Sequence, residues 1–163
     1  MKFLPLALAI SLSTATAGKA QSQSPLVAWL PFQEALNEGS SSDKKVLVDI
    51  FAPWCSWCAK MQKEAYMDEE VLSYLREHFV AARLDISVEN DTLTYSGMQL
   101  PSAYLAAGFG AEGTPTTVFL TASGDYITRL PGYASPSDFL SVLKFIASDS
   151  YLTQSYEEFS ASK

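Results

Sequence analysis

The chain has only two cysteines, Cys55 and Cys58, and two residues separate them. They follow a nearly continuous apolar, β-branched run at residues 45–51, which only Asp49 interrupts. Such a run is typical of a central strand that is covered on both faces. A disulfide across two residues closes too short a loop to stabilise a domain. A zinc site needs four ligands, and His78 is the one histidine available beside the thiols. The pattern therefore favours redox chemistry at the start of a helix.

Hydrophobic periodicity and turn signals predict how the chain is organised around this pair. Its 163 residues are the length of a single domain. Helices are expected over residues 31–38 with Gly39 as the stop, over 55–65, after Asp68, around 101–107 and after Ser135. Strands are expected over 45–51, 79–86, 116–121 and 126–130, the last two joined as an antiparallel hairpin. This alternation predicts an α/β domain.

The N-terminal segment has the features of an export signal. Lys2 supplies positive charge, residues 3–12 (FLPLALAISL) are apolar, and small residues follow. We expect a cleavable signal peptide at residues 1–20, with its boundary between 17 and 24, ahead of a folded domain at 26–163. The alternative is a membrane anchor, but about ten apolar residues are too few to cross about 30 Å of hydrocarbon. We therefore expect an exported protein without stable membrane insertion.

The charge balance excludes one class of partner. With 18 acidic and 11 basic side chains, the formal net charge is −7. Proteins that bind nucleic acids present concentrated Lys and Arg to the phosphate backbone. We therefore expect no nucleic-acid partner.

The order strand, C-x-x-C, helix, strand, helix, X-Pro, hairpin and helix resembles the thioredoxin-fold family. The resemblance covers residues 26–148 and rests on Val48-Asp49-Ile50-Phe51-Ala52-Pro53-Trp54-Cys55-Ser56-Trp57-Cys58, on Gly113-Thr114-Pro115-Thr116 and on Gly132. It implies a central mixed β-sheet flanked by helices. Residues 68–85 and 151–159 are most similar to exported bacterial thioredoxin-like proteins, such as the SoxW type that accompanies sulfur oxidation and the C-terminal domain of the membrane thiol reductant transporter. We expect the tail with Tyr151, Tyr156 and Phe159 to be a packed helical extension.

The two thiols have different expected roles. A cysteine at a helix N-terminus faces unpaired backbone N–H groups and the positive end of the helix dipole, which favour its thiolate. Cys55 is therefore expected to be the nucleophile, and Cys58, one turn later, the resolving thiol. The Ser56-Trp57 dipeptide between them is neither the Gly-Pro of reducing thioredoxins nor the Pro-His of strong oxidants. The dipeptide thus leaves the direction of electron transfer open.

Asp49 is the strongest secondary signal. A carboxylate within an apolar strand is costly to bury unless it is paired or protonated. Its position, six residues before Cys55, is that of the buried acid which in the resembling family takes and returns the proton of the resolving cysteine through water. The alternative is a structural ion pair with Arg83, on a predicted strand that the resemblance places beside that of Asp49. The two roles are compatible.

The resemblance also implies a substrate groove. In the family, the proline after the long loop is cis and lies against the C-x-x-C motif, where the backbone of the preceding residue pairs with the substrate chain. Thr114 and Pro115 are therefore expected to contact substrate, with Trp54 and the Gly132 backbone completing a shallow apolar groove. Trp57 has two open interpretations, a surface aromatic that contacts partners or one that folds over its helix.

Together these features predict a thiol:disulfide oxidoreductase of the bacterial periplasm, which reduces disulfides of partner proteins through the Cys55/Cys58 dithiol and a mixed disulfide. We expect a monomer with protein disulfide or dithiol substrates, a membrane or soluble thiol redox partner, and no bound cofactor or metal. One alternative is a module that holds Cu(I) through the two thiolates, although Met61 is the only methionine close to them in sequence. The other is a redox-inactive partner-binding protein. His78 is expected at the surface or as a helix cap.

Overall fold

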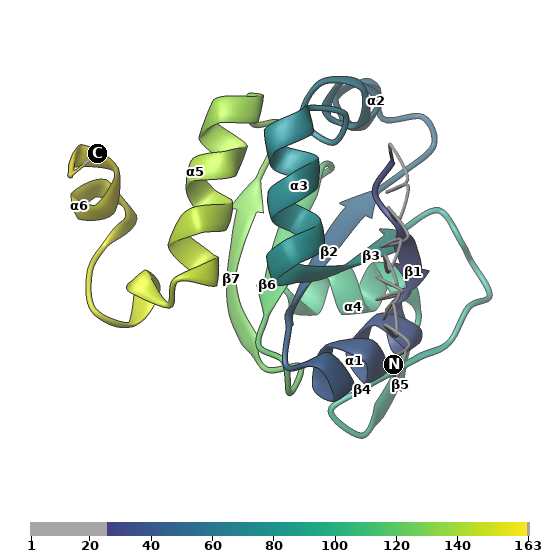
Figure 1. Cartoon of the computed structure of the whole chain (residues 1–163). Helices are drawn as coiled ribbons and strands as arrows, with labels where there is room; N and C mark the ends of the chain where they lie inside the picture. The colour runs from purple at the N-terminus through teal and green to yellow at the C-terminus, as the bar shows by residue number, and fades with distance from the viewer. Residues whose placement is uncertain (1–25, 163) are drawn as a thin grey trace, which may run out of the picture.

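A five-stranded sheet with the order β1-β3-β2-β6-β7 forms the centre of the molecule (Figure 1). The computed structural model describes residues 26–162, so the predicted signal peptide lies outside it. The strands are β1 (Trp29–Pro31), β2 (Lys45–Phe51), β3 (Phe79–Asp85), β6 (Thr116–Leu120) and β7 (Tyr126–Pro131). β1 and β2 run parallel to β3, whereas β6 is antiparallel to β2 and β7 to β6. The expected mixed sheet is confirmed.

Helices cover both faces of this sheet. They are α1 (Phe32–Ser42), α2 (Ser56–Glu64), α3 (Glu69–His78), α4 (Ser102–Gly108), α5 (Pro136–Ala147), α6 (Tyr156–Ala161) and the short 3-10 helix η1 (Ser150–Leu152). α3 and α5 lie side by side on one face (Figure 1), and residues of α1 and α4 pack on the other. Within residues 26–162, none of these helices is long and apolar enough to cross a membrane.

The alternation of side chains along β2 decides which way Asp49 points. Val46, Val48 and Ile50 belong to the hydrophobic cluster shared with α1 and α4. Leu47 belongs to the cluster shared with α3 and α5. Because side chains two residues apart share a face of a strand, Asp49 points to the same side as Leu47. This face carries the acid into the α3/α5 layer of the core.

The predicted stop at Gly39 is wrong, because α1 continues to Ser42 and ends where Asp43 takes a left-handed conformation with φ of 56°. Gly39 is buried within the helix. A Cβ atom at this position would lie 2.6 Å from Val46 Cγ2. The glycine therefore allows close packing of α1 on β2 and does not terminate the helix.

Three short strands were not predicted from the sequence. β1 has three residues, and a two-stranded hairpin, β4 (Leu93–Tyr95) and β5 (Met98–Leu100), lies in the segment between β3 and α4. Its turn residues Ser96 and Gly97 have φ of 49° and 79°, the positive values that tight hairpin turns require. Strands of three residues are too short to show an alternating pattern.

The C-terminal segment packs on α5, as expected. The ring centroid of Phe145 lies 6.5 Å from that of Tyr151, 5.5 Å from that of Tyr156 and 5.2 Å from that of Phe159. In Figure 1 this extension projects from the end of α5 away from the sheet. The aromatic side chains of this segment thus pack at the edge of the hydrophobic core.

Candidate active site

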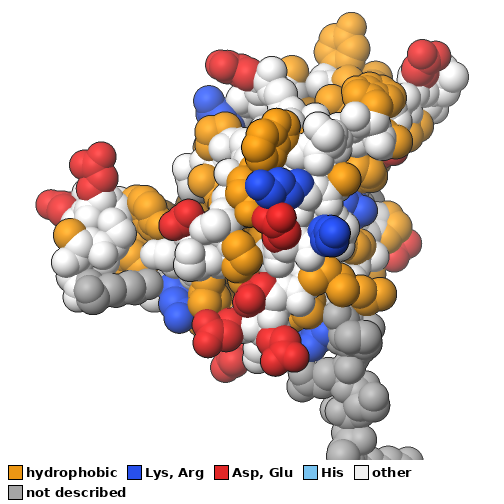
Figure 2. Space-filling view, turned by 90° about the horizontal axis from the view of Figure 1, so that it is seen from above, with side chains coloured by type: hydrophobic (Ala, Val, Ile, Leu, Met, Phe, Trp, Pro, Cys, Tyr) orange, Lys and Arg blue, Asp and Glu red, His pale blue; other side chains and the backbone are white. Residues whose placement is uncertain are grey.

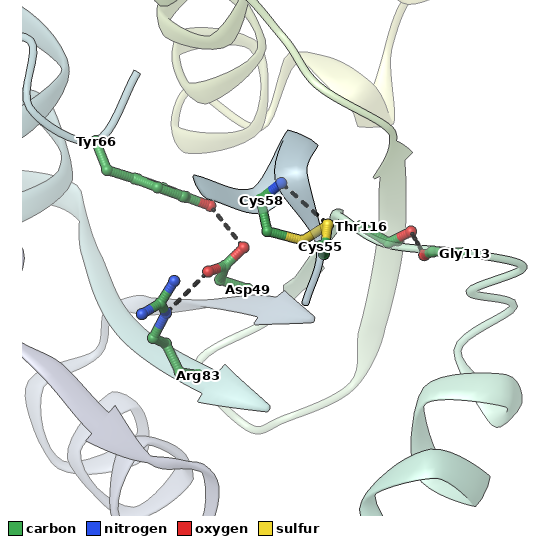
Figure 3. The surroundings of a disulfide bond; sticks show 7 residues. All are labelled: Asp49, Cys55, Cys58, Tyr66, Arg83, Gly113 and Thr116. Carbon is green, nitrogen blue, oxygen red and sulfur yellow. Dashed lines mark hydrogen bonds and ion pairs between the residues drawn. A yellow bond between two sulfur atoms is a disulfide. The ribbon is translucent and has the colours of Figure 1, made fainter. Parts of the chain in front are cut away.

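Cys55 and Cys58 form a disulfide at the start of α2 (Figure 3). Cys55 is the N-cap residue of this helix, and its Sγ atom accepts a hydrogen bond from the backbone N–H of Cys58 at 3.0 Å. Cys58 is buried, with 5% of its surface exposed, whereas Cys55 is partly exposed. Cys55 is therefore the sulfur that a partner reaches first, and it faces the unpaired N–H groups that favour a thiolate.

The chain places the disulfide by a tight turn after β2. The backbone N–H of Cys55 donates to the carbonyl of Ala52 at 3.1 Å, which closes this turn. On the inner side of α2, Met61 and the following Ala65 are fully buried. The helix is thus fixed to the sheet while its first turn stays at the surface.

Asp49 lies beneath this site with both carboxylate oxygens engaged. Its Oδ2 atom accepts a hydrogen bond from Arg83 Nε at 3.0 Å, and its Oδ1 atom accepts one from the Tyr66 hydroxyl at 3.3 Å. Figure 3 shows the carboxylate between the Tyr66 hydroxyl and the side chain of Cys58. Only 2% of Asp49 is exposed. The ion pair with Arg83 that the sequence offered as an alternative is therefore present.

Neighbouring strands hold the partners of Asp49 in place. In the sheet, Asp49 is the register partner of Arg83 on β3 and of Thr117 on β6. The Thr117 Oγ1 atom lies 3.4 Å from the Tyr66 hydroxyl. Because Tyr66 donates its proton to Asp49, Thr117 is the donor in this second contact. Asp49 thus belongs to a hydrogen-bonded network with Arg83, Tyr66 and Thr117, which links β2 to β3 and β6.

Burial raises the pKa of Asp49 above its ordinary value, and the charge of Arg83 and the hydrogen bonds from Arg83 and Tyr66 only partly offset this effect. Burial also raises the pKa of Tyr66, and the Asp49 charge adds to that shift. Tyr66 therefore stays a neutral hydroxyl donor. Asp49 can hold a proton at a pH at which an exposed aspartate is ionised.

Two aromatic rings lie against the Arg83 guanidinium. Its Cζ atom lies 4.1 Å from the ring centroid of Phe51 and 5.0 Å from that of Trp29. Trp29 in turn meets Tyr66 edge to face, with centroids 4.9 Å apart. The two rings thus shield part of the guanidinium from water, while the Arg83 side chain as a whole stays 28% exposed.

The loop before β6 lies beside the entry to β7. The Thr114–Pro115 peptide bond is cis. The Thr116 hydroxyl donates to the Gly113 carbonyl at 2.7 Å, and the Gly132 N–H donates to the Pro115 carbonyl at 2.8 Å. These two hydrogen bonds bring Thr114, Pro115 and Gly132 together, as the resemblance implied.

Two shallow cavities flank Pro115. One, of about 340 Å³, is lined by Trp57, Thr114, Pro115, Gly132 and Tyr133. The other, of about 220 Å³, extends from the same three loop residues to Gly110, Glu112 and Arg129. Trp54 was expected in this groove but lines neither cavity. It stands 75% exposed at the surface.

Trp57 packs against a neighbouring ring and is still exposed, so its contact with partners stays a prediction. Its ring centroid lies 5.7 Å from that of Tyr133, and the Lys60 ammonium lies 5.1 Å and 4.6 Å from the two rings. Trp57 is nevertheless 55% exposed and lines the cavity beside Pro115. Figure 2, which looks down on the α2 end, shows hydrophobic side chains at the surface among charges of both signs. Sequence reasoning missed Tyr133, because only tertiary packing brings it to α2.

The described part of the chain shows no cluster of metal ligands that would support the copper-binding alternative. Among residues 26–162, no group of three or more His, Cys, Asp or Glu side chains is arranged to hold a metal ion. His78 is the last residue of α3 and packs against Tyr74, with ring centroids 4.2 Å apart and planes tilted by 40°. It is partly exposed at the helix end, as expected.

Comparison with known proteins identifies relatives of the whole domain. Residues 32–147 match the family described as the thioredoxin-like domain. The chain is 30% identical to the thiol:disulfide interchange protein DsbD of Actinobacillus pleuropneumoniae over 109 residues, which are 64% of this chain and 16% of that protein. It is 28% identical to the disulfide bond reductase DsbH of Chlamydia pneumoniae over 107 residues, covering 63% of this chain and 61% of that protein.

A solved structure shows the same architecture. The thioredoxin-fold protein of Helicobacter pylori superposes with a TM-score of 0.61 at 27% identity, covering 74% of this chain and 80% of that one. The chain spans only 12–16% of the length of several curated relatives that it matches, DsbD among them. The match therefore concerns one domain of those longer proteins. Because the family match extends from α1 to the end of α5 and includes the disulfide, the chain belongs to the thioredoxin-like domain family.

Proposed function

We propose that this protein is a thiol:disulfide oxidoreductase that reduces disulfides in partner proteins. The observation that carries the proposal is the Cys55–Cys58 disulfide at the N-terminus of α2, with the buried Asp49 on its Cys58 side (Figure 3). A bridge that only stapled the first turn of α2 would need neither a partly exposed sulfur nor a buried acid beside it. The reducing direction is supported by the similarity to a disulfide bond reductase.

The reduced protein would act in two exchange steps. The Cys55 thiolate attacks one sulfur of a substrate disulfide, an S–S bond forms between them, and the other substrate sulfur leaves as a thiolate that takes up a proton. Cys58 then loses its proton and attacks the Cys55 sulfur. The intramolecular disulfide forms and the second substrate thiolate leaves. Two electrons pass from the dithiol to the substrate disulfide.

Asp49 would accept the proton that Cys58 releases. The acid is buried, its pKa is raised, and it lies on the Cys58 side of the disulfide in Figure 3. A carboxyl with a raised pKa is a stronger base at neutral pH than an ordinary aspartate. A water molecule would bridge the two groups, as in the resembling family.

The substrate chain would lie along the loop that ends in Pro115. Proline has no N–H to give to a sheet, so the backbone of Thr114 at this loop is open to pair with an added strand. Trp57 and Tyr133 form an apolar wall of the adjoining cavity. Trp54, exposed beside the disulfide, would contact the substrate from the other side.

We further propose that the protein acts outside the cytosol as a monomer. The N-terminal segment has the charge and apolar run of an export signal, and relatives carry the names of disulfide-handling proteins. A membrane or soluble thiol donor would return the Cys55–Cys58 disulfide to the dithiol. The exchange itself needs no bound cofactor.

The decisive test is reduction of insulin by the protein with dithiothreitol as electron source. The wild type should accelerate precipitation of the insulin B chain, and Cys55→Ser should not. Equilibration in thiol buffers, followed by Trp fluorescence, gives the potential, since Trp54 precedes the pair and Trp57 lies between the two cysteines. A value above about −180 mV would contradict the reducing direction, and a wild type no faster than Cys55→Ser would contradict the activity.

A further inference from the structure

The β4–β5 hairpin forms one wall of a further cavity, apart from the two beside Pro115. Together with the end of α4 and the edge strand β7, it encloses about 410 Å³. The lining is mostly apolar and includes Tyr95, Met98, Leu100, Leu105, Phe109 and Tyr126. The proposed exchange reaction uses none of these residues.

The walls of this cavity are held rigidly. The Tyr95 hydroxyl donates to the Gly124 carbonyl at 2.9 Å, which ties the hairpin to the β6–β7 turn. Phe109 stacks on Tyr126 with ring centroids 6.1 Å apart and planes at 14°, and Tyr95 meets Phe109 edge to face at 5.0 Å. The backbone N–H of Ser102 donates to Asp91 Oδ1 at 2.9 Å and fixes the segment before the hairpin to α4. The cavity is therefore preformed.

Arg129 stands where this cavity meets the active-site groove. Arg129 and Gly110 line both this cavity and the one beside Pro115. A Cβ atom at Gly110 would lie 2.6 Å from an Arg129 Nη atom, so the glycine makes room for the guanidinium. Within the described part of the chain, Arg129 makes no ion pair and its side chain no hydrogen bond. It is an exposed cation without a carboxylate partner.

The two cavities are within reach of one extended peptide. Along β7, Arg129 precedes Gly132 by three residues, which corresponds to about 10 Å at about 3.3 Å per residue, and Gly132 is bonded to Pro115. Trp57, which lies between the two cysteines, lines the same cavity as Gly132 and Pro115, so a substrate strand a few residues long would extend from this end of the groove to Arg129. Glu112 lines the cavity beside Pro115 but not the β4–β5 cavity, so only Arg129, among the described residues, brings a charge to the apolar cavity. The charge pattern therefore favours an acidic side chain at Arg129.

We propose that the β4–β5 cavity extends the substrate groove and selects extended protein segments with two features. An acidic side chain about three residues from the reactive cysteine pairs with Arg129, and an apolar side chain beyond it enters the cavity. This inference rests on the proposed function and names the substrate class of the same site. An unpaired guanidinium at the rim of an apolar cavity is complementary to this combination of acid and hydrophobe.

The test uses cysteine peptides carried as mixed disulfides with thiopyridine. Reduced protein attacks the peptide sulfur through Cys55, thiopyridine leaves, and Cys58 then releases the peptide thiol as the protein disulfide forms. The first step is followed by thiopyridone absorbance. One peptide has Glu three residues from Cys on each side and Leu beyond it. A second has Lys in place of Glu, and a third has Ser in place of Leu. A neutral dithiodipyridine reports the reactivity of Cys55 alone.

The wild type should react about fivefold faster with the Glu/Leu peptide than with the Lys/Leu peptide, the range of a partly exposed ion pair. Arg129→Glu should reverse this preference and Arg129→Lys should retain it. Lys144→Glu on α5, which makes the same charge change on the opposite face, should leave it intact. Met98→Ser should abolish the advantage of Leu over Ser, whereas Tyr104→Ser, exposed on α4 outside the cavity lining, should not.

Two outcomes separate this inference from the proposed function. If all variants reduce dithiodipyridine at the wild-type rate but Arg129→Glu keeps the preference for the Glu/Leu peptide, the docking proposal is wrong and the exchange activity stands. If the wild type does not react with dithiodipyridine, the oxidoreductase proposal itself is wrong.

Discussion

Asp49 lies opposite Arg83 in the β2–β3 ladder, and its Oδ2 atom accepts a hydrogen bond from Arg83 Nε at 3.0 Å. This pair is asymmetric, since the side chain of Asp49 is 2% exposed and that of Arg83 28%. The guanidinium keeps contact with solvent while the carboxylate does not. Desolvation therefore outweighs the attraction of the cation, and the pKa of Asp49 is raised in spite of its partner.

The raised pKa predicts a pH-dependent gain in stability for Asp49→Asn. An acid whose pKa is higher in the folded than in the unfolded state stabilises the fold below the unfolded pKa, about 3.9. That stability is lost as pH rises through the folded pKa. The free energy of unfolding of Asp49→Asn relative to wild type should thus increase from pH 4 towards neutral pH. Urea unfolding of the oxidised proteins at several pH values measures this difference, and a flat difference would contradict the raised pKa.

The same variant should slow the second exchange step. Without a carboxylate below Cys58, deprotonation of this thiol would depend on solvent, and general-base assistance typically contributes about 10²-fold or more. Stopped-flow measurement of peptide release from the Cys55 mixed disulfide isolates this step. Attack by Cys55 on dithiodipyridine serves as the internal control and should change little. Equal release rates for wild type and Asp49→Asn across pH 6–9 would rule out the proton-acceptor role.

Tyr66→Phe should shift the pH profile of that release step to higher pH. The Tyr66 hydroxyl donates to Asp49 Oδ1 and lowers the pKa of the acid, so its removal raises that pKa further. The lost hydrogen bond should also cost about 1 kcal/mol of stability. Thr117→Val is the matched control, because it removes the hydroxyl that contacts Tyr66 but none that contacts Asp49. A stability loss without a shifted profile would limit Tyr66 to a structural role.

Gly39→Ala should destabilise the fold although alanine is the better helix former. In an open helix the substitution stabilises by about 1 kcal/mol. Here the added Cβ would lie 2.6 Å from Val46 Cγ2 and 3.1 Å from the Lys44 carbonyl, and overpacking of this kind costs about 1–3 kcal/mol. Thermal unfolding tests the balance, with Gly108→Ala as control, since a Cβ at Gly108 meets nothing within 4 Å. A higher melting temperature for Gly39→Ala would contradict this prediction, because it would show that Val46 and β2 shift to accept the added methyl group at little cost.

Local signals explain which elements could be predicted from the sequence. α3 begins where Asp68 Oδ1 accepts hydrogen bonds from the N–H groups of Glu70 and Val71, and α5 where Ser135 accepts one from Asp138. Such caps lie within a few residues of the helix that they start. The predicted stop of α1 at Gly39 is wrong because this glycine permits close packing of α1 on β2. A packing contact of this kind leaves no signal in the local sequence. β1, β4 and β5 are held by pairing with other segments and have no periodic pattern of their own.

The residues of the candidate site also include some that could be predicted before the structure and some that could not. Asp49 and Arg83 could be paired before the structure, because both lie in predicted strands that the resemblance to the thioredoxin-fold family places side by side. Tyr66, Tyr133 and Arg129 could not, since their contacts with Asp49, Trp57 and the Pro115 groove depend on how separate elements pack. Their sequence neighbourhoods carry no motif that would single them out.

The most direct test of the central claim is trapping of mixed disulfides with single-cysteine variants. Cys58→Ser keeps the exposed sulfur at the helix N-terminus but cannot resolve, so it should accumulate disulfide-linked partners through Cys55. Cys55→Ser leaves only the buried sulfur, 5% exposed, and should trap few or none. Non-reducing gels and mass spectrometry of the adducts, formed in the compartment where the protein acts, identify the linked cysteine. Adducts on Cys58→Ser alone are the predicted result, whereas adducts on Cys55→Ser alone, or on neither variant, would contradict this account.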